Sequence, residues 1–156
     1  MEKIAILLAT YNGEQYLAQQ IDSLLSQTYK GWNLYIHDDG STDNTASIIH
    51  SYCDKYDNLT ALDYPPTGGA KNNFLSLLQR IDADYYMFCD QDDVWDEKKI
   101  EIEINRMHEM ESTYGDIPLL VFSDLRVVDN TLNEISPSMW RDGGVNPEYL
   151  CSFDKG

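Results

Sequence analysis

The sequence has few basic residues and no long apolar run. Lysine and arginine total 11 against 27 aspartate and glutamate residues, which gives the 156 residues a formal net charge of -16. A nucleic-acid groove needs a basic surface that displaces counterions from phosphates, so this balance argues against nucleic-acid binding. No stretch approaches the roughly 20 apolar residues that span a bilayer. The apolar run near Met1 is too short to indicate a secretion signal.

Cysteine is also scarce, and its pattern excludes a disulfide framework. Cys53, Cys89 and Cys151 are odd in number and far apart, and they form no CxxC metal pair. A reducing environment is therefore expected, which favours the cytoplasm. The three histidines show no metal-ligand spacing. The remaining composition, 42% hydrophobic and 24% charged, is typical of a single globular domain.

Strand-like and helix-like segments alternate along the chain. Apolar runs of strand length occupy 4–9, 34–37, 59–63, 85–89 and 119–123, and helices are expected at 14–26, 72–81 and 96–114. Ser41 or Thr42 is expected to cap a further helix that runs to Tyr56. Residues 126–135 are expected to form a strand or a hairpin. This alternation predicts an α/β fold, in which helices cover both faces of a mostly parallel sheet.

In such a fold, the loops that follow the strands lie on one edge of the sheet. The ligand crevice of these sheets lies outside the carboxyl ends of the strands. The loops expected on this edge are 10–13, 38–41, 64–72 and 90–93. The unusual polar clusters of the sequence are therefore expected to share one edge.

The cluster Asp90-Gln91-Asp92-Asp93 follows an apolar strand directly. If the chain turns there, two of the carboxylates can hold Mg²⁺ or Mn²⁺, which prefer carboxylate and phosphate oxygens. Such an ion can neutralise a pyrophosphate leaving group. The alternative is an acidic turn that caps the helix expected from Asp96. The strand before the cluster and Trp95 after it favour the metal site.

Three other polar segments on this edge each leave two interpretations open. Asp38-Asp39 can accept hydrogen bonds from a ribose or base, or can belong to an ordinary turn. Tyr11, in Thr10-Tyr11-Asn12-Gly13, can stack on a base or belong to a polar turn. Lys71 can contact a phosphate or be a surface lysine.

Motifs in four places together resemble family 2 glycosyltransferases of the GT-A fold. They are Ala9-Thr10-Tyr11-Asn12-Gly13, Ser26-Gln27-Thr28-Tyr29, Asp38-Asp39-Gly40-Ser41-Thr42-Asp43 and Asp90-Gln91-Asp92-Asp93. The last falls where that family carries its DxD metal motif, and the resemblance covers the chain up to about Asp129. The variant Asp-Gln-Asp-Asp-Val-Trp is most similar to bacterial enzymes that build surface polysaccharides, including rhamnosyltransferases.

The resemblance implies a role for each matching residue. It places the nucleotide at Thr10, Tyr11, Asn12, Asp38, Asp39, Lys71 and Asp90. It places a divalent metal, Mn²⁺ or Mg²⁺, at Asp92 and Asp90, with Asp93 beside them. Relatives carry an arginine or another polar residue at the position of Lys71, so the resemblance is weaker there.

The reaction implied is inverting transfer of a sugar from a dTDP- or UDP-sugar to a saccharide or lipid-linked acceptor. A metal ion stabilises the departing diphosphate, and a carboxylate takes the proton of the acceptor hydroxyl. Relatives place that base well beyond the DxD motif, and nothing after Asp129 matches it. Asp124 is expected to face the acceptor instead. Residues 1–156 are therefore expected to be the nucleotide-sugar-binding part of a longer domain, with its base beyond Gly156 and with peripheral membrane association through the missing part.

Two other functions remain as alternatives. Asp90-Gln91-Asp92-Asp93-Val94 also satisfies the DxDx(T/V) nucleophile motif of haloacid dehalogenase-like phosphohydrolases. However, that motif normally begins its domain, whereas 84 residues precede Tyr85 here. The second alternative is a nucleotide-binding domain without turnover. A calcium-binding EF-hand is excluded, because the sixth residue from Asp90 is Trp95 where that loop needs glycine.

Overall fold

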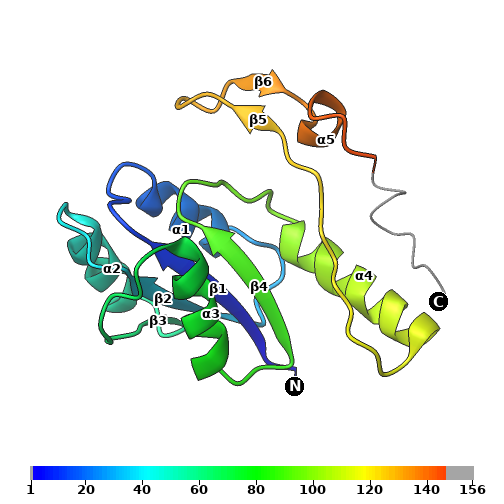
Figure 1. Ribbon diagram of the computed structural model, residues 1–156, viewed down its shortest axis with the longest axis horizontal. Helices are drawn as coiled ribbons and strands as arrows, with labels where there is room; N and C mark the ends of the chain where they lie inside the picture. Colours follow the sequence, from blue (N-terminus) through cyan, green and yellow to red (C-terminus); the bar gives the residue numbers. More distant parts are fainter. Residues whose placement is uncertain (1, 147–156) are drawn as a thin grey trace. The chain divides into compact units, whose positions relative to one another are not determined.

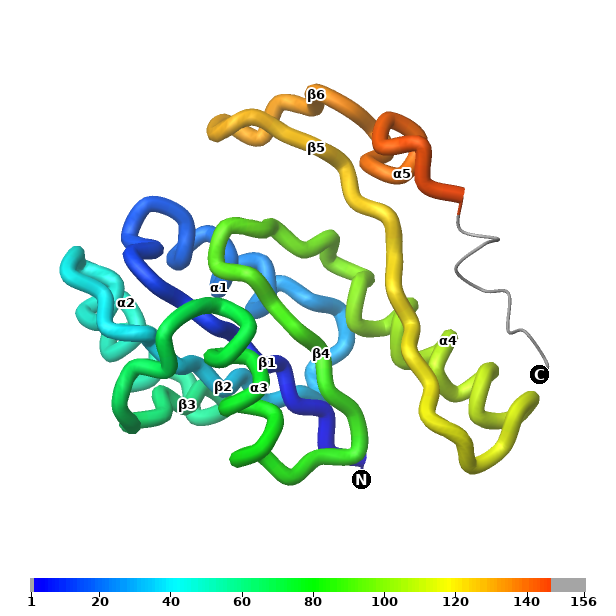
Figure 2. Tube along the Cα trace, in the orientation of Figure 1, coloured from blue at the N-terminus to red at the C-terminus, as the bar shows by residue number. Residues whose placement is uncertain are grey.

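The computed structural model describes residues 2–146, and the chain divides into two compact units, Met1–Ile104 and Asn105–Gly156 (Figures 1 and 2). The first unit alternates strands and helices. Its elements are β1 (Ile4–Thr10), α1 (Leu17–Leu25), β2 (Trp32–Asp38), α2 (Thr45–Cys53), β3 (Leu59–Ala61), α3 (Ala70–Arg80) and β4 (Tyr85–Asp90). The long helix α4 (Lys99–Tyr114) begins in this unit. The predicted alternation is confirmed for this part of the chain.

The first unit is built on a four-stranded sheet in the order β3-β2-β1-β4. All of its strand pairs are parallel. In the register, Thr10 pairs with Asp38 and Ala9 pairs with Asp90. The carboxyl ends of the three strands therefore lie level with one another, which brings the loops that follow them to one edge of the sheet.

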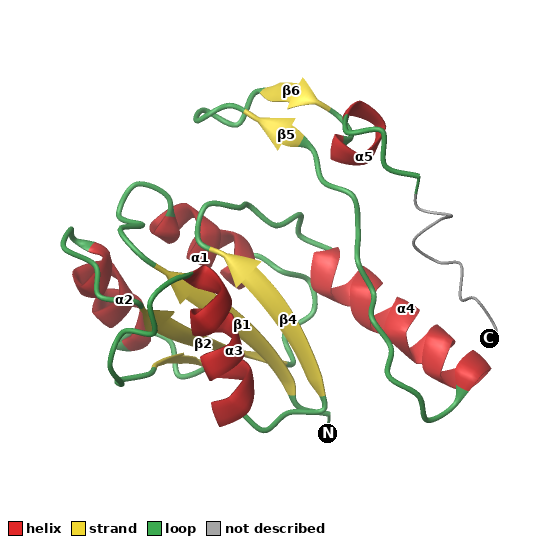
Figure 3. Cartoon of the chain, viewed as in Figure 1, coloured by secondary structure: helices red, strands yellow, loops and turns green. Residues whose placement is uncertain are grey.

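Helices cover both faces of the sheet (Figure 3). Residues alternate across a strand, so Ile4, Ile6 and Leu8 of β1 pack in one core with residues of α1, α2 and the start of α4. Ala5, Leu7 and Ala9 pack with Leu77 of α3 in a second core on the other face. Both faces of β1 are buried, which explains its unbroken apolar run. The predicted fold class is thus confirmed.

The second unit contains the later turns of α4, the strands β5 (Val127–Val128) and β6 (Glu134–Ser136), and the short helix α5 (Met139–Asp142). The two strands pair antiparallel, which confirms the predicted hairpin at 126–135. The strand predicted at 119–123 is wrong. These residues pair with no strand in the described part of the chain, and Leu120 is 75% exposed. An apolar run cannot stay in a strand without a partner for its backbone groups.

None of the helices described between residues 2 and 146 is long and apolar enough to cross a membrane.

Candidate functional site

The turn after β1 and the turn before α2 are held together by side chains. The backbone N–H of Asn12 donates to Ser41 Oγ at 2.7 Å. In return, the side-chain Oδ1 of Asn12 accepts from the backbone N–H of Thr42 at 2.9 Å. The backbone N–H of Gly13 donates to Thr45 Oγ1 at 2.8 Å, and Thr45 is fully buried. Asn12, predicted to bind a nucleotide, thus has a structural role through both groups.

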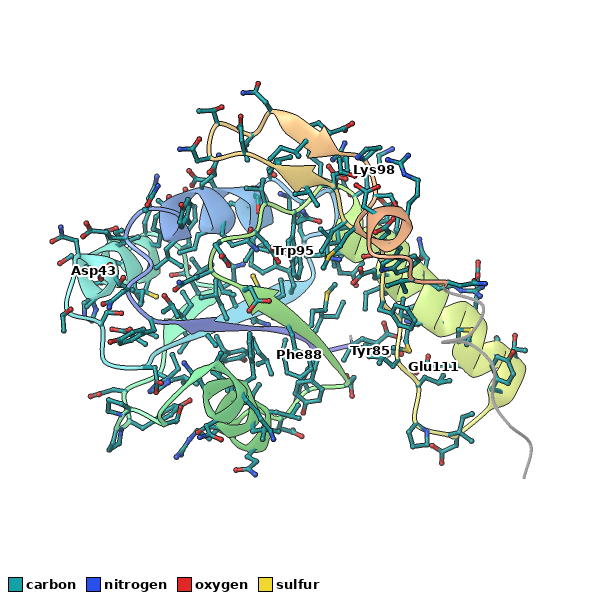
Figure 4. All side chains as sticks on the ribbon, turned by 45° about the horizontal axis from the view of Figure 1, so that its top comes forward. Asp43, Tyr85, Phe88, Trp95, Lys98 and Glu111 are labelled. Carbon is teal, nitrogen blue, oxygen red and sulfur yellow. The ribbon has the colours of Figure 1, made fainter. Side chains whose placement is uncertain are left out.

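These contacts correct the predicted start of the second helix. Ser41 and Thr42 do not cap it, because their groups bond to Asn12 instead. Helix α2 begins at Thr45, and its N-cap residue Asn44 makes no side-chain capping hydrogen bond. The Asp43 carboxylate accepts from the Thr45 backbone N–H and hydroxyl at 3.0 and 2.6 Å (Asp43 is labelled in Figure 4).

Asp39 lies at the end of β2 and holds the loop that precedes α3. Its carboxylate accepts hydrogen bonds from the backbone N–H of Thr67, from the Thr67 hydroxyl at 2.9 Å, and from the backbone N–H groups of Gly68 and Gly69 at 3.2 and 2.6 Å. Burial acts to raise the pKa of Asp39, but these donors lower it overall. Asp38 closes its own turn by accepting from the Ser41 hydroxyl at 2.5 Å.

The carboxylates of Asp90, Asp92 and Asp93 are in a different situation. None of them accepts a hydrogen bond within the described part of the chain. Partial burial, and then the charge of Asp92, raise the pKa of Asp90. Burial, and then Asp90 and Asp92, raise the pKa of Asp93, although Lys99 opposes this. The three exposed carboxylates thus lie close together at the end of β4 and accept no hydrogen bond from residues 2–146.

This donor set fits a divalent cation that a ligand helps to bind. Among residues 2–146, no group of three or more histidine, cysteine, aspartate or glutamate side chains converges as a ready metal site. Mg²⁺ and similar ions are, however, usually held by one or two carboxylates, with phosphate oxygens and waters as the other ligands. Asp90 and Asp92 could meet that requirement, because both carboxylates are exposed at the end of β4 and neither accepts a hydrogen bond from residues 2–146.

Gln91, between the acidic residues, joins the ends of β4 and β1. Its Oε1 accepts from the Thr10 hydroxyl at 2.5 Å and from the Tyr11 backbone N–H at 2.9 Å. Its Nε2 donates to the Tyr11 carbonyl at 3.1 Å. Thr10 is buried, whereas the Tyr11 side chain is 55% exposed at this edge. The sequence analysis assigned no role to Gln91, and nothing in its local pattern indicates one.

A second set of residues that sequence reasoning missed lies on the buried face of α1 and just after its end. Ser23 Oγ accepts from the Trp95 backbone N–H at 3.0 Å. Gln27 donates to the Asp96 carbonyl at 2.7 Å and accepts from the Ile100 backbone N–H at 3.1 Å. Ser23 and Gln27 together fix the segment between β4 and α4. The buried Trp95 of this segment is labelled in Figure 4. Polar residues on the apolar face of an amphipathic helix are the signal that could have found them.

Gln20, one turn earlier, belongs to the same set. It is fully buried. In the amide orientation that satisfies both of its ends, its nitrogen donates to the Asp93 carbonyl and to Ser23 Oγ, and its oxygen accepts from the Trp95 indole N–H at 3.3 Å. Helix α1 therefore holds the backbone of the acidic turn from behind.

The other two predicted residues lie in different surroundings. Lys71 is exposed in the first turn of α3. Asp124, in the second unit, accepts from the Ser138 hydroxyl at 2.5 Å and from the backbone N–H groups of Trp140 and Leu125 at 3.0 and 2.8 Å. These hydrogen bonds, that of Ser138 first, lower its pKa. Its carboxylate therefore stabilises the start of α5.

Comparison with known proteins places this arrangement in a family. Residues 5–134 match glycosyl transferase family 2. The dTDP-rhamnosyl transferase RfbG of Shigella flexneri is 36% identical over 103 residues, which cover 63% of this chain and 36% of that protein. The Escherichia coli enzyme WfgD, named UDP-Glc:alpha-D-GlcNAc-diphosphoundecaprenol beta-1,3-glucosyltransferase, is 32% identical over 67% of this chain and 40% of its own length. The chain thus spans well under half of these relatives.

Solved structures show the same fold. Residues 1–349 of Staphylococcus aureus TarS in complex with UDP superpose with a TM-score of 0.63 at 22% identity, over 96% of this chain and 52% of that one. The mannosyltransferase PcManGT from Pyrobaculum calidifontis, in complex with GDP-Man and Mn²⁺, gives a TM-score of 0.54 over 59% of this chain and 28% of that one. These likenesses confirm the GT-A fold, and the chain belongs to glycosyl transferase family 2.

Proposed function

We propose that residues 1–156 form the nucleotide-sugar-binding part of an inverting glycosyltransferase. The enzyme would move a sugar from a dTDP- or UDP-sugar to a saccharide or lipid-linked acceptor in cell-surface polysaccharide biosynthesis. The family match and the names of RfbG and WfgD support this class of donor and acceptor. A cytoplasmic location, with peripheral membrane association, suits the free thiols of Cys53 and Cys89.

The contrast among the aspartates at the sheet edge carries this proposal. Asp39 and Asp43 accept hydrogen bonds from the chain, and the pKa of each is lowered. Asp90 and Asp93 have no such donors, and the pKa of each is raised. Carboxylates that are used structurally accept hydrogen bonds from the fold, whereas the exposed carboxylates of this cluster accept none from the described residues and are open to a cation. Asp92 and Asp90 would hold Mn²⁺ or Mg²⁺, with Asp93 beside them.

When bound, a divalent ion at this turn would neutralise the charge that develops on the departing diphosphate. The chain's own residues would bind and orient the nucleotide. Tyr11 is exposed at the same edge and would stack on the base, while the neighbouring Thr10 is buried and donates its hydroxyl to Gln91. Asp38 and Asp39 end the neighbouring strand, where a ribose or base is bound in sheets of this kind.

Two further assignments complete the proposed site. Lys71 would contact the phosphates from the first turn of α3, where it is exposed. No catalytic base is assigned within the described residues, because the carboxylate of Asp124 is already used at the start of α5. The match to glycosyl transferase family 2 spans Asp90 to Val94, which argues against a haloacid dehalogenase-like function.

Calorimetric titration with UDP and with dTDP, each with and without Mn²⁺, tests the proposal. We expect Mn²⁺ to strengthen binding of the preferred nucleotide, and Asp92→Ala to weaken the Mn²⁺-dependent binding at least about tenfold, the scale of substitutions at metal sites. Asp57→Ala, an exposed aspartate after α2, is the matched control and should bind as the wild type does. Equal affinity with and without Mn²⁺ would contradict the metal role.

Sugar transfer requires a separate assay. Release of UDP or dTDP from the nucleotide sugar, measured on a longer chain with a lipid-linked acceptor, would distinguish a transferase from a domain that only binds the nucleotide.

A further inference from the structure

Gln91 extends the pairing of β4 and β1 beyond the end of the strands. The last paired residues of these strands are Asp90 and Ala9. After Asp90 the backbone turns away, but the Gln91 side-chain amide continues along β1, where it bonds both the N–H and the C=O of Tyr11 at 2.9 and 3.1 Å. The Gln91 side-chain amide thus takes the place of the next peptide group in the hydrogen-bond ladder between β4 and β1. The backbone of the acidic turn meanwhile leaves the sheet.

The space for this amide is specific. A Cβ atom on Gly13 would lie 2.5 Å from Gln91 Oε1 and 2.8 Å from Thr10 Oγ1, so only glycine leaves room for the contact. The same Oε1 accepts the hydroxyl of Thr10, whose side chain is 2% exposed. Loss of the Gln91 amide would therefore leave a buried hydroxyl without its acceptor, a state that proteins rarely tolerate.

The other end of the acidic turn is held independently. The Trp95 backbone N–H donates to Ser23 Oγ of α1 at 3.0 Å. The turn between Asp90 and Trp95 is thus fixed at both ends, and among the described residues the hydrogen bonds that link it to the turn carrying Tyr11 all involve Gln91.

We propose that Gln91 is a positioning residue that couples recognition of the nucleotide base at Tyr11 to cation binding at Asp90 and Asp92. This inference rests on the proposed function. One side chain holds the backbone of Tyr11 and is itself placed between the two carboxylates, so the two turns move together. A nucleotide diphosphate that contacts both turns then binds a preformed pair of sites, and the effect of the cation on nucleotide affinity depends on that link.

The measured quantity is the enhancement factor, the ratio of nucleotide affinity with Mn²⁺ to that without Mn²⁺. It is obtained by titrating the chain with UDP and with dTDP. We expect Gln91→Ala to lower this factor about tenfold, within the usual range of coupling between sites. Gly13→Ala should have the same effect, because its Cβ displaces the Gln91 amide without altering a carboxylate. The double variant should be no worse than either single one, since both remove one contact.

Gln19→Ala is the matched control, since Gln19 is exposed on α1 and should keep the wild-type factor. A merely structural role for Gln91 would lower the binding stoichiometry or the unfolding temperature and leave the factor unchanged, and that result would overturn the inference. A wild-type factor in Gln91→Ala at full stoichiometry would overturn it as well. A wild-type chain that shows no enhancement by Mn²⁺ would instead overturn the proposed function itself.

Discussion

Replacing Gln27, which lies just after the end of α1, with alanine should destabilise the first unit more than any exposed substitution on α1. Gln27 is fully buried, and its amide donates to the Asp96 carbonyl at 2.7 Å and accepts from the Ile100 backbone N–H at 3.1 Å. Ile100 lies in the first turn of α4, where a backbone N–H has no partner within the helix. Gln27 therefore caps the start of α4 from the segment that follows α1.

The magnitude follows from what Gln27→Ala leaves behind. Two hydrogen bonds between elements are lost, each worth about 1 kcal/mol net, and a buried N–H without an acceptor adds about 1 kcal/mol or more. The expected loss in the free energy of unfolding is thus about 3 kcal/mol. The control variant Gln19→Ala changes an exposed glutamine of α1 and should stay within about 0.5 kcal/mol of the wild type.

Urea unfolding followed by tryptophan fluorescence measures this difference, because Trp32 and Trp95 lie in the core against α1. Far-ultraviolet circular dichroism serves as a second probe of the same transition. If the two variants unfold with free energies within about 0.5 kcal/mol of each other, the capping role assigned to Gln27 is wrong.

Two other predictions concern the carboxylates and the base. Tyr11→Ala should weaken UDP and dTDP binding about tenfold, the cost of one stacked base, yet leave Mn²⁺-pyrophosphate binding unchanged. If Mn²⁺-pyrophosphate binding weakens as much as nucleotide binding, Tyr11 does not stack on the base. Asp93→Asn should raise the free energy of unfolding at neutral pH by a few tenths to about 1 kcal/mol, given solvent screening. Burial and its acidic neighbours raise the pKa of Asp93 in the folded state, so its charge costs stability above that pKa, and the cost disappears as the pH falls. The gain measured for Asp93→Asn should therefore shrink at acidic pH, and a gain that grows there would contradict this.

Most of the sheet could be predicted from the sequence because β1, β2 and β4 contain apolar runs bounded by polar residues. The run 4–9 could be recognised as a strand without knowledge of its partners. Both of its faces are buried, so its apolar run is unbroken. The run 119–123 has a similar pattern, but it could form a strand only by pairing with another strand. The local sequence does not specify such a partner. An apolar run therefore forms a strand only where the fold supplies a partner strand.

The acidic cluster of the site could be predicted for a related reason. Asp90 and Asp92 stand out at a strand end, where the topology predicts a ligand crevice. The supporting residues could not be found in the same way. Gln91 and Ser23 act through contacts between residues distant in the chain, 80 positions apart for Gln91 with Tyr11 and 72 for Ser23 with Trp95. Such pairs become visible only when the fold brings them together.

The most direct test of the central claim is a crystal structure of this chain with Mn²⁺ and UDP or dTDP, with the ion located by its anomalous scattering. We predict one strong anomalous peak within bonding distance of the carboxylates of Asp92 or Asp90 and of the diphosphate, with the base against Tyr11. A nucleotide bound at this edge without a peak at the acidic turn, or a peak at other carboxylates, would contradict the account.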